Sequence, residues 1–360
     1  MYPRIEIDLY KLKHNASLLS KKCSEHNIEA AVVTKVYCAF PEIVDYLKDS
    51  GVKYIADSRI KNLKKLDNIN LEKILIRIPM LTEIEDVVKY SDISLNSELE
   101  VIQKIDETCE RLNKKHKIAL MVDLGDLREG YFKEEELFEV VDEILKLKNI
   151  EFIGVGTNLT CYGAVIPSKE NLGKLCELGE KIEEKFDIRL SFISGGNSSS
   201  LHLLDKNDMP KRVTNLRLGE AIALGRETAY SQDIKGAYQD AFKLVCEIVE
   251  LKEKPSIPIG EIGVDAFGNK PYYEDKGIRK RAILGIGKQD TNVDGMSTVD
   301  SKQEILGASS DHLIVDVTDS EKEYKVGDTI EFNLEYGALM AATTSNYVNK
   351  VFKKRVEEKV

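Results

Sequence analysis

Short apolar runs of strand length alternate with amphipathic helical stretches through roughly the first 230 residues, and this alternation constrains the fold more than any other feature. The helices between the runs carry apolar positions three and four residues apart. The expected strands span residues 29–35, 54–57, 74–78, 93–96, 118–123, 152–158, 191–194 and 216–218, and the clearest helices span 41–49, 82–90, 98–115, 134–146 and 169–186. Such repeated strand–helix units predict an α/β fold, a parallel (β/α)8 barrel of the TIM type.

An open, doubly wound parallel sheet would produce a similar alternation and is the competing fold. A dinucleotide-binding sheet of that kind carries a glycine-rich fingerprint directly after its first strand. No such fingerprint follows the first expected strand of this chain. The closed barrel is therefore the favoured architecture.

The alternation of strand-like runs and amphipathic helices ends in the last third of the chain. Residues 242–251, 281–287, 312–317 and 329–334 look like strands separated by Gly and Asp turns, and helical periodicity is lacking there. We therefore predict a barrel domain over residues 1–235 and a smaller β-domain over residues 236–360. Residues 1–10 are a candidate extra strand of the second domain.

Charge balance and cysteine usage narrow the class of protein. The chain has 62 acidic against 52 basic residues and a net charge of -10, which disfavours a nucleic-acid partner. No run approaches the roughly 20 apolar residues of a membrane helix, and the first residues lack the pattern of a signal peptide. The six cysteines form no CxxC pair. We therefore expect a cytoplasmic protein with reduced thiols and without a membrane partner.

Polar residues gather after the expected strands, where a (β/α)8 barrel carries its active site. They are Lys35, Arg128, Asn158, the stretch 195–200 and the stretch 217–220. Lys35 ends an apolar strand, and a desolvated lysine can lose its charge and act as a Schiff-base nucleophile. The alternative, which its position alone favours, is a lysine whose head reaches solvent at the barrel mouth.

The stretch 195–200, Gly-Gly-Asn-Ser-Ser-Ser, offers small residues, backbone N–H groups and hydroxyls that can cradle a phosphate. A flexible turn with a helix N-cap is the alternative. Arg217 could bind a ring nitrogen or a phosphate, and it could equally form a surface ion pair.

The five histidines form no metal-like pair such as HxxxH, and no GxSxG elbow occurs. We therefore predict neither a metal site nor a serine hydrolase.

The polar segments also occur in an order that extends over almost the whole chain. Residues 123–130, DLGDLREG, are similar to a DTGMGRxG segment, and residues 309–318, SSDHLIVDVT, to a CMDQLMVDVT segment. The other segments are residues 5–8 with Asn15, 32–35, 196–198, 217–220, 326–328 and Tyr347. In this shared order the chain resembles the alanine-racemase family of pyridoxal-phosphate enzymes, the fold type III group.

A narrower resemblance concerns two further segments. Residues 154–163 and 260–270 look like the ornithine-racemase branch of this family, which makes ornithine the first expected substrate. The alternatives are an alanine or broad-specificity amino-acid racemase, a pyridoxal-phosphate lyase of the same fold, and a non-catalytic protein that binds pyridoxal phosphate. The lyase would need a metal, and the binding protein would be a lone barrel.

The resemblance implies a role for each matched residue. Lys35 would bind pyridoxal 5'-phosphate covalently and act as one acid/base, and Arg217 would face the pyridine nitrogen. The family works as a head-to-tail homodimer in which Ser310 and Asp311 would reach the neighbouring subunit's site. The remaining implied cofactor residues are Asn158 (in place of a ring-stacking histidine), Asn197, Ser198, Gly219, Glu220 and Tyr347, and the implied substrate residue is Arg128.

The second acid/base is where the sequence departs from the family, which uses a tyrosine there. An alignment from Gly260 places Asp265 at this position, whereas an alignment from Gly268 places Phe267 there, which cannot move protons. We favour Asp265, with Tyr272 or Tyr273 as alternatives. The family's modified lysine is replaced by Met121. A distal ammonium on the substrate would pair with an acidic residue, for which Asp311 and Glu129 are the two candidates.

Overall fold

The computed structural model describes residues 1–264, 267–268, 270 and 272–354 and divides into two compact units. One unit comprises Leu9–Gln239, and the other combines Met1–Asp8 with Asp240–Val360. Within the described residues, every helix is too short or too polar to cross a lipid bilayer.

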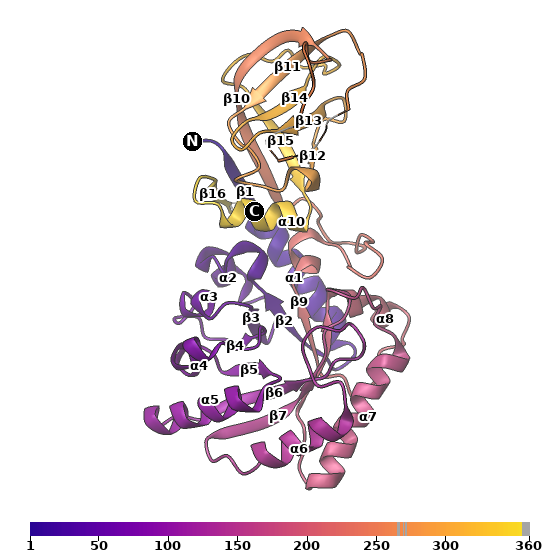
Figure 1. Ribbon diagram of the computed structural model, residues 1–360. Coiled ribbons are helices and arrows are strands. Elements are labelled where there is room, and N and C mark those ends of the chain that lie inside the picture. Colours follow the sequence, from indigo (N-terminus) through magenta and orange to yellow (C-terminus); the bar gives the residue numbers. More distant parts are fainter. Residues whose placement is uncertain (265–266, 269, 271, 355–360) are drawn as a thin grey trace, which may run out of the picture. The chain divides into compact units, whose positions relative to one another are not determined.

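The first unit is a closed barrel of parallel strands (Figure 1). Its strands are β2 (Glu29–Val33), β3 (Tyr54–Asp57), β4 (Glu72–Leu75), β5 (Ile93–Asn96), β6 (His116–Met121), β7 (Ile150–Gly156), β8 (Phe192–Asn197) and β9 (Asn215–Leu218). Strand β9 closes the barrel on β2, where Arg217 lies opposite Ala31. The predicted (β/α)8 barrel is confirmed, and the open sheet is excluded.

Helices run along the outside of the barrel strands (Figure 1). They are α1 (Leu9–Ser24), α2 (Pro41–Leu47), α3 (Ile60–Lys64), α4 (Ile84–Tyr90), α5 (Leu99–Leu112), α6 (Glu134–Ile144), α7 (Lys169–Phe186), α8 (Leu201–Asp205) and α9 (Glu220–Leu224), with 3-10 turns η1 (Lys35–Tyr37), η2 (Leu81–Glu83) and η3 (Ser198–Ser200). Helix α7 begins at a reciprocal cap in which Ser168 and Asn171 each accept a backbone N–H from the other.

The barrel strands read as apolar runs because they are buried on both faces. Strands β3 and β5 are buried along their whole length, as expected where helices cover the outside of a parallel barrel. A buried cluster draws side chains from β2 to β8 and includes Ala31, Val33, Tyr54, Ala56, Ile74, Ile93, Leu95, Ala119, Met121, Ile153 and Phe192. Met121 therefore serves as packing in the core.

The second unit contains an eight-stranded sheet. Its strands are β1 (Arg4–Asp8), β10 (Phe242–Pro255), β11 (Ile278–Leu284), β12 (Met296–Thr298), β13 (Glu304–Ala308), β14 (Leu313–Asp316), β15 (Thr329–Leu334) and β16 (Asn349–Lys353). The amino-terminal strand β1 pairs antiparallel with β10 and parallel with β16. The predicted C-terminal β-domain is thus confirmed as a fold.

The second unit also contains a helix that the sequence pattern did not indicate. The sequence shows no helical periodicity among the strands of this unit, yet α10 (Tyr336–Thr344) is a helix of nine residues, and η4 (Val293–Gly295) is a further 3-10 turn. The residues of α10 are apolar on almost all sides of the helix, so the sequence shows no alternation of apolar and polar faces from which a helix could be predicted.

Candidate active site

Lys35 begins η1, and a single residue separates it from the end of strand β2. The preceding residue, Thr34, donates its backbone N–H to Ala56 at 2.8 Å and its hydroxyl to Asp57 at 2.6 Å. Thr34 and Asp57 are both fully buried. Burial raises the pKa of the Asp57 carboxyl, and the hydrogen bond from Thr34 opposes that shift. The backbone that carries Lys35 is therefore held at the carboxyl end of two adjacent strands.

Arg217 on β9 is a buried cation with neutral partners. Its guanidinium donates to the Ser194 hydroxyl, to the Thr157 carbonyl at 2.7 Å and to the Asn158 side-chain oxygen at 3.4 Å. Burial lowers the pKa of Arg217 to about 10, and the nearby Glu129 carboxylate opposes that shift. Arg217 thus remains charged at neutral pH. Because it is buried, the alternative that it forms an ion pair on the surface is excluded.

The stretch after β8 forms a tight turn that leads into η3 and α8. Gly196 has a φ of +105°, a backbone conformation that residues with a Cβ rarely adopt. Asn197 caps η3 by accepting the backbone N–H of Ser199 at 2.8 Å. The Ser198 hydroxyl accepts the N–H of Ala221, at the start of α9, at 3.2 Å. Ser198, Gly219 and Glu220, from two different loops, are thereby brought together.

Two buried polar atoms in this region have no hydrogen-bond partner among the described residues. They are the Ser199 hydroxyl and the side-chain nitrogen of Asn158. The oxygen of the same Asn158 side chain accepts a hydrogen bond from Asn197 at 3.1 Å, so its amide is oriented with the nitrogen unused. Unsatisfied buried donors are costly unless a bound group supplies an acceptor. This end of the barrel therefore has the chemistry to hold a polar, anionic ligand.

The loop after β6 presents Arg128 and Glu129 from a rigid support. Asp123 accepts the backbone N–H of Gly125 at 2.8 Å and of Leu127 at 3.1 Å. Gly130 has a φ of +126°, and a Cβ there would lie 2.7 Å from the Asp123 nitrogen, so only glycine fits. The buried Asp126 carboxylate ties this loop to the next by accepting three backbone N–H groups, those of Thr160, Tyr162 and Val165.

The predicted residues of the second unit lie on its exposed loops. Ser310 and Asp311 occupy the turn between β13 and β14, where the Asp311 carboxylate accepts a 3.0 Å hydrogen bond from His312. Tyr347, between α10 and β16, is 71% exposed. Of the candidate second bases, Tyr272 and Tyr273 are exposed, and Asp265 lies outside the described residues.

Thr157 and Ser194, the two principal partners of Arg217, were not singled out from the sequence. Thr157 directly follows β7, and Ser194 lies within β8. Only Ser194 offered a signal in the sequence, namely a small hydroxyl residue in an apolar run beside the strand of a buried arginine. Thr157 accepts through its backbone carbonyl, which any residue carries, so its side chain gave no signal.

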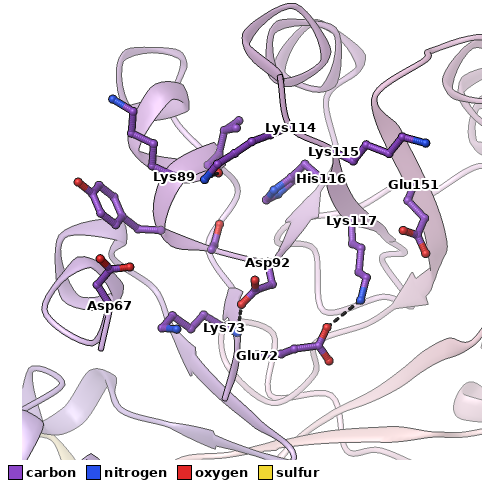
Figure 2. A pocket seen from close by; sticks show the side chains of 13 residues that line it. Asp67, Glu72, Lys73, Lys89, Asp92, Lys114, Lys115, His116, Lys117 and Glu151 are labelled. Carbon is purple, nitrogen blue, oxygen red and sulfur yellow. Dashed lines mark hydrogen bonds and ion pairs between the residues drawn. The ribbon is translucent and has the colours of Figure 1, made fainter. Parts of the chain in front are cut away.

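A charged hollow lies at the opposite, amino-terminal ends of strands β4 to β7 (Figure 2). Its charges are largely satisfied locally, because Lys117 pairs with Glu72 at 2.7 Å and Asp92 accepts the backbone N–H of Lys73 at 2.7 Å. His116 is buried beneath it, and burial lowers its pKa to about 4. This end of a (β/α)8 barrel generally serves stability, whereas chemistry occurs at the other end.

The chain is similar in sequence to known amino-acid racemases. Residues 7–226 match the family described as alanine racemase, N-terminal domain. The chain is 57% identical over 350 residues to an ornithine racemase of Acetoanaerobium sticklandii, and the match covers 97% of this chain and 99% of that protein. It is 38% identical over 354 residues to a lysine racemase of Thermotoga maritima, covering 98% and 99% of the two chains.

Solved alanine racemases share the fold. The structure from Clostridium difficile 630 matches with a TM-score of 0.76 at 21% identity, covering 99% of this chain and 97% of that one. The structure from Bartonella henselae, which has covalently bound pyridoxal phosphate, matches with a TM-score of 0.73 at 17% identity, covering 98% and 100%. At identities this low, the likeness establishes the fold.

Proposed function

The chain belongs to the alanine racemase family, and we propose that it is a pyridoxal-phosphate-dependent amino-acid racemase that interconverts L- and D-ornithine. The observation that supports ornithine as the substrate is the 57% sequence identity to the ornithine racemase, which extends over nearly the full length of both chains. The similarity to a lysine racemase supports the same class of substrate, because lysine also has a distal amine. The family resemblance predicted from the sequence is thereby confirmed.

The residues at the carboxyl ends of the strands suit pyridoxal phosphate. We propose that Lys35 binds the cofactor covalently and that Arg217 faces its ring nitrogen. The unused donors of Asn158 and Ser199 support this assignment, because a bound phosphate and ring would supply the missing acceptors. The proposed phosphate ligands are Asn197, Ser198, Gly219, Glu220 and Tyr347. When bound, the cofactor supplies an electron-withdrawing ring that makes the substrate's α-proton acidic.

Racemisation needs two acid/base groups on opposite faces of the α-carbon. We propose that the Lys35 amine moves the proton on one face and that the Asp265 carboxylate moves it on the other. Support for Lys35 is its anchored position beside Thr34 and Asp57. Arg128, which stands on a rigid loop, would bind the substrate's α-carboxylate. Asp265→Asn is expected to abolish interconversion in both directions, and full activity of that variant would reject this assignment.

The experiment that tests the function follows each enantiomer of a panel of amino acids in deuterated water. The panel contains ornithine, lysine, alanine and the uncharged five-carbon norvaline. We expect ornithine to be interconverted fastest, with deuterium appearing only at the α-carbon. A preference for alanine would favour the alternative alanine racemase. No interconversion of any amino acid by cofactor-loaded protein would favour the non-catalytic binding protein.

We also propose that the protein works as a head-to-tail homodimer in the cytoplasm, with Ser310 and Asp311 supplied to the partner's site. All six cysteines are free thiols, which fits a reducing compartment. A mixture of the variants Lys35→Ala and Asp311→Ala, each expected to be inactive by itself, tests the exchange, because a mixed dimer would contain one intact site. Recovery of about a quarter of wild-type activity is expected from random pairing. No recovery on mixing would contradict shared sites.

A further inference from the structure

We propose that Glu129 binds the distal ammonium of the substrate and thereby sets the preference for diamino acids. This inference rests on the proposed function, since it names the residue that would select ornithine within a family of amino-acid racemases. It also chooses between the two acidic residues, Glu129 and Asp311, that the sequence left open.

Glu129 stands beside the groups that would hold the rest of the substrate. Its carboxylate binds the Arg128 guanidinium through two contacts, 2.5 Å to Nε and 2.7 Å to Nη2. The side chain of Glu129 is 19% exposed, whereas that of Arg128 is 41% exposed, so the carboxylate is the more enclosed partner. The same carboxylate acts electrostatically on Arg217, the buried cation of β9. Glu129 therefore lies at the carboxyl ends of the strands, among the candidate active-site residues of the barrel.

Three other carboxylates at these strand ends, those of Asp57, Asp123 and Asp126, are already occupied by the loops that they support. Asp57 accepts hydrogen bonds from the Thr34 hydroxyl and the Arg59 backbone. Asp123 accepts backbone N–H groups of its own loop, and Asp126 accepts those of the following loop. Releasing any of them for a ligand would leave buried backbone donors unpaired. Glu129, by contrast, pairs with a flexible arginine side chain that can turn to another anion without disturbing the backbone.

Asp311 is less suited to the role on the same grounds. One of its carboxylate oxygens accepts hydrogen bonds from His312 at 3.0 Å and from the hydroxyls of Ser309 and Ser310 at 3.3 Å each. The hydrogen bond from His312 lowers the pKa of Asp311. Asp311 is therefore held by donors of its own turn, whereas the partner of Glu129 is Arg128, which is itself a candidate ligand of the substrate.

Charge exchange explains why a diamino acid would be preferred. Without substrate, Arg128 and Glu129 neutralise each other. A substrate α-carboxylate that binds Arg128 competes with Glu129 for the guanidinium, which weakens binding of a simple amino acid. A distal ammonium removes that penalty, because it pairs with the Glu129 carboxylate that Arg128 has released. Arg128 then pairs with the substrate's α-carboxylate and Glu129 with its distal ammonium. A substrate with an uncharged side chain leaves Glu129 without this second partner.

The test compares Glu129→Gln with wild-type holoenzyme on L-ornithine and L-norvaline, which differ by the distal amine. Glu129→Gln should lower kcat/KM for ornithine by roughly 10- to 100-fold, the value of one charge-assisted hydrogen bond. It should leave kcat/KM for norvaline within about threefold of wild type or raise it, because Arg128 is then free for the α-carboxylate. Glu129→Asp, which keeps the charge, should retain most of the preference, and it provides a second variant if Glu129→Gln does not fold.

A matched control is Glu136→Gln, which removes a carboxylate that pairs with Lys133 at 2.9 Å on an exposed part of the same unit. It should change neither substrate's kcat/KM. An equal loss for ornithine and norvaline in Glu129→Gln would overturn the inference, and so would an ornithine-selective loss in Asp311→Asn with none in Glu129→Gln. A wild-type enzyme that does not interconvert ornithine would instead reject the proposed function, so the two failures are distinguishable.

Discussion

Thr34 donates a 2.6 Å hydrogen bond from its hydroxyl to the Asp57 carboxylate, and Thr34 directly precedes Lys35 in the chain. Both side chains are fully buried, so the bond joins β2 to β3 where the backbone turns into η1. The carboxylate also accepts the backbone N–H of Arg59 at 2.8 Å. A lysine that must move a proton to and from one face of a carbon needs such an anchor, because small displacements of a reacting group cost large factors in rate.

Replacing Thr34 with valine, which has a similar shape and no hydroxyl, should therefore affect stability and activity together. The buried Asp57 carboxylate would lose a donor, and the free energy of unfolding should fall by about 1–3 kcal/mol. We expect kcat to fall by about tenfold because Lys35 is less well placed. Urea denaturation and steady-state kinetics measure the two effects. Thr34→Ser, which keeps the hydroxyl, should preserve both quantities, and equal damage by serine and valine would show that the hydroxyl is not the cause.

Arg217→Lys should impair the enzyme although it keeps the charge. A lysine ammonium cannot reproduce the planar contacts of the guanidinium with Ser194, Thr157 and Asn158. We expect kcat/KM to fall by at least about 100-fold, with a changed absorbance spectrum of the bound cofactor. The control is Arg226→Lys, at an exposed ion pair with Asp233. Wild-type activity and an unchanged spectrum in Arg217→Lys would contradict the assignment of Arg217 to the cofactor ring.

The barrel could be predicted from the sequence because its strands are buried on both faces and its helices on one. The ranges 54–57, 93–96 and 169–186 agree with β3, β5 and α7 to the residue. Helix α10 could not be predicted, because its residues are apolar on nearly all sides and no period distinguishes it from a strand.

The candidate site could be predicted only in part. Lys35 and Arg217 follow from position and from the resemblance, but the burial of Arg217 depends on β9 lying between β2 and β8 in the closed barrel. The pairing of Arg128 with Glu129 likewise depends on side-chain conformations set by the loop after β6. Contacts of this kind join residues through tertiary structure, and a single sequence carries no direct record of them.

His116 makes the stability of the barrel depend on pH. It is buried with its ring nitrogen 3.0 Å from the Ser94 hydroxyl, and burial lowers its pKa from 6.5 to about 4. The unfolded chain therefore binds a proton more readily between these values. The contribution of His116 to the free energy of unfolding is fully present above about pH 6.5. It is lost as the pH drops towards 4, by about 3 kcal/mol in total.

The measurement is urea denaturation at pH 7.5 and pH 5 for wild type and His116→Gln. Between these values the wild type should lose about 2 kcal/mol more than the variant, which has no group to protonate at this position. His26→Gln, at a half-buried position, is the control and should follow the wild type. Parallel pH profiles of wild type and His116→Gln would show that His116 does not titrate as expected.

Asn15 on helix α1 should be a stabilising residue without a role in chemistry. It is fully buried, donates to the carbonyls of Ile222 and Tyr238 at 3.0 and 2.8 Å, and accepts the Tyr238 N–H at 2.8 Å. Asn15→Ala should lower the free energy of unfolding by about 2–4 kcal/mol, because it removes the side-chain partner of three backbone groups, one of them buried and two half-buried. Asn70→Ala, at an exposed position, should change it by less than about 0.5 kcal/mol. A similar small effect for Asn15→Ala would mean that other groups replace its hydrogen bonds.

The proposed attachment of pyridoxal phosphate to Lys35 can be measured by locating the cofactor on the chain. The purified holoenzyme is reduced with borohydride, digested, and analysed by mass spectrometry to find the lysine that bears the cofactor. Borohydride fixes a Schiff base in place, so the cofactor should be found on the peptide that contains Lys35 and on no other. The cofactor on a different lysine, or a holoenzyme in which reduction leaves Lys35 unmodified, would show that Lys35 does not carry the cofactor.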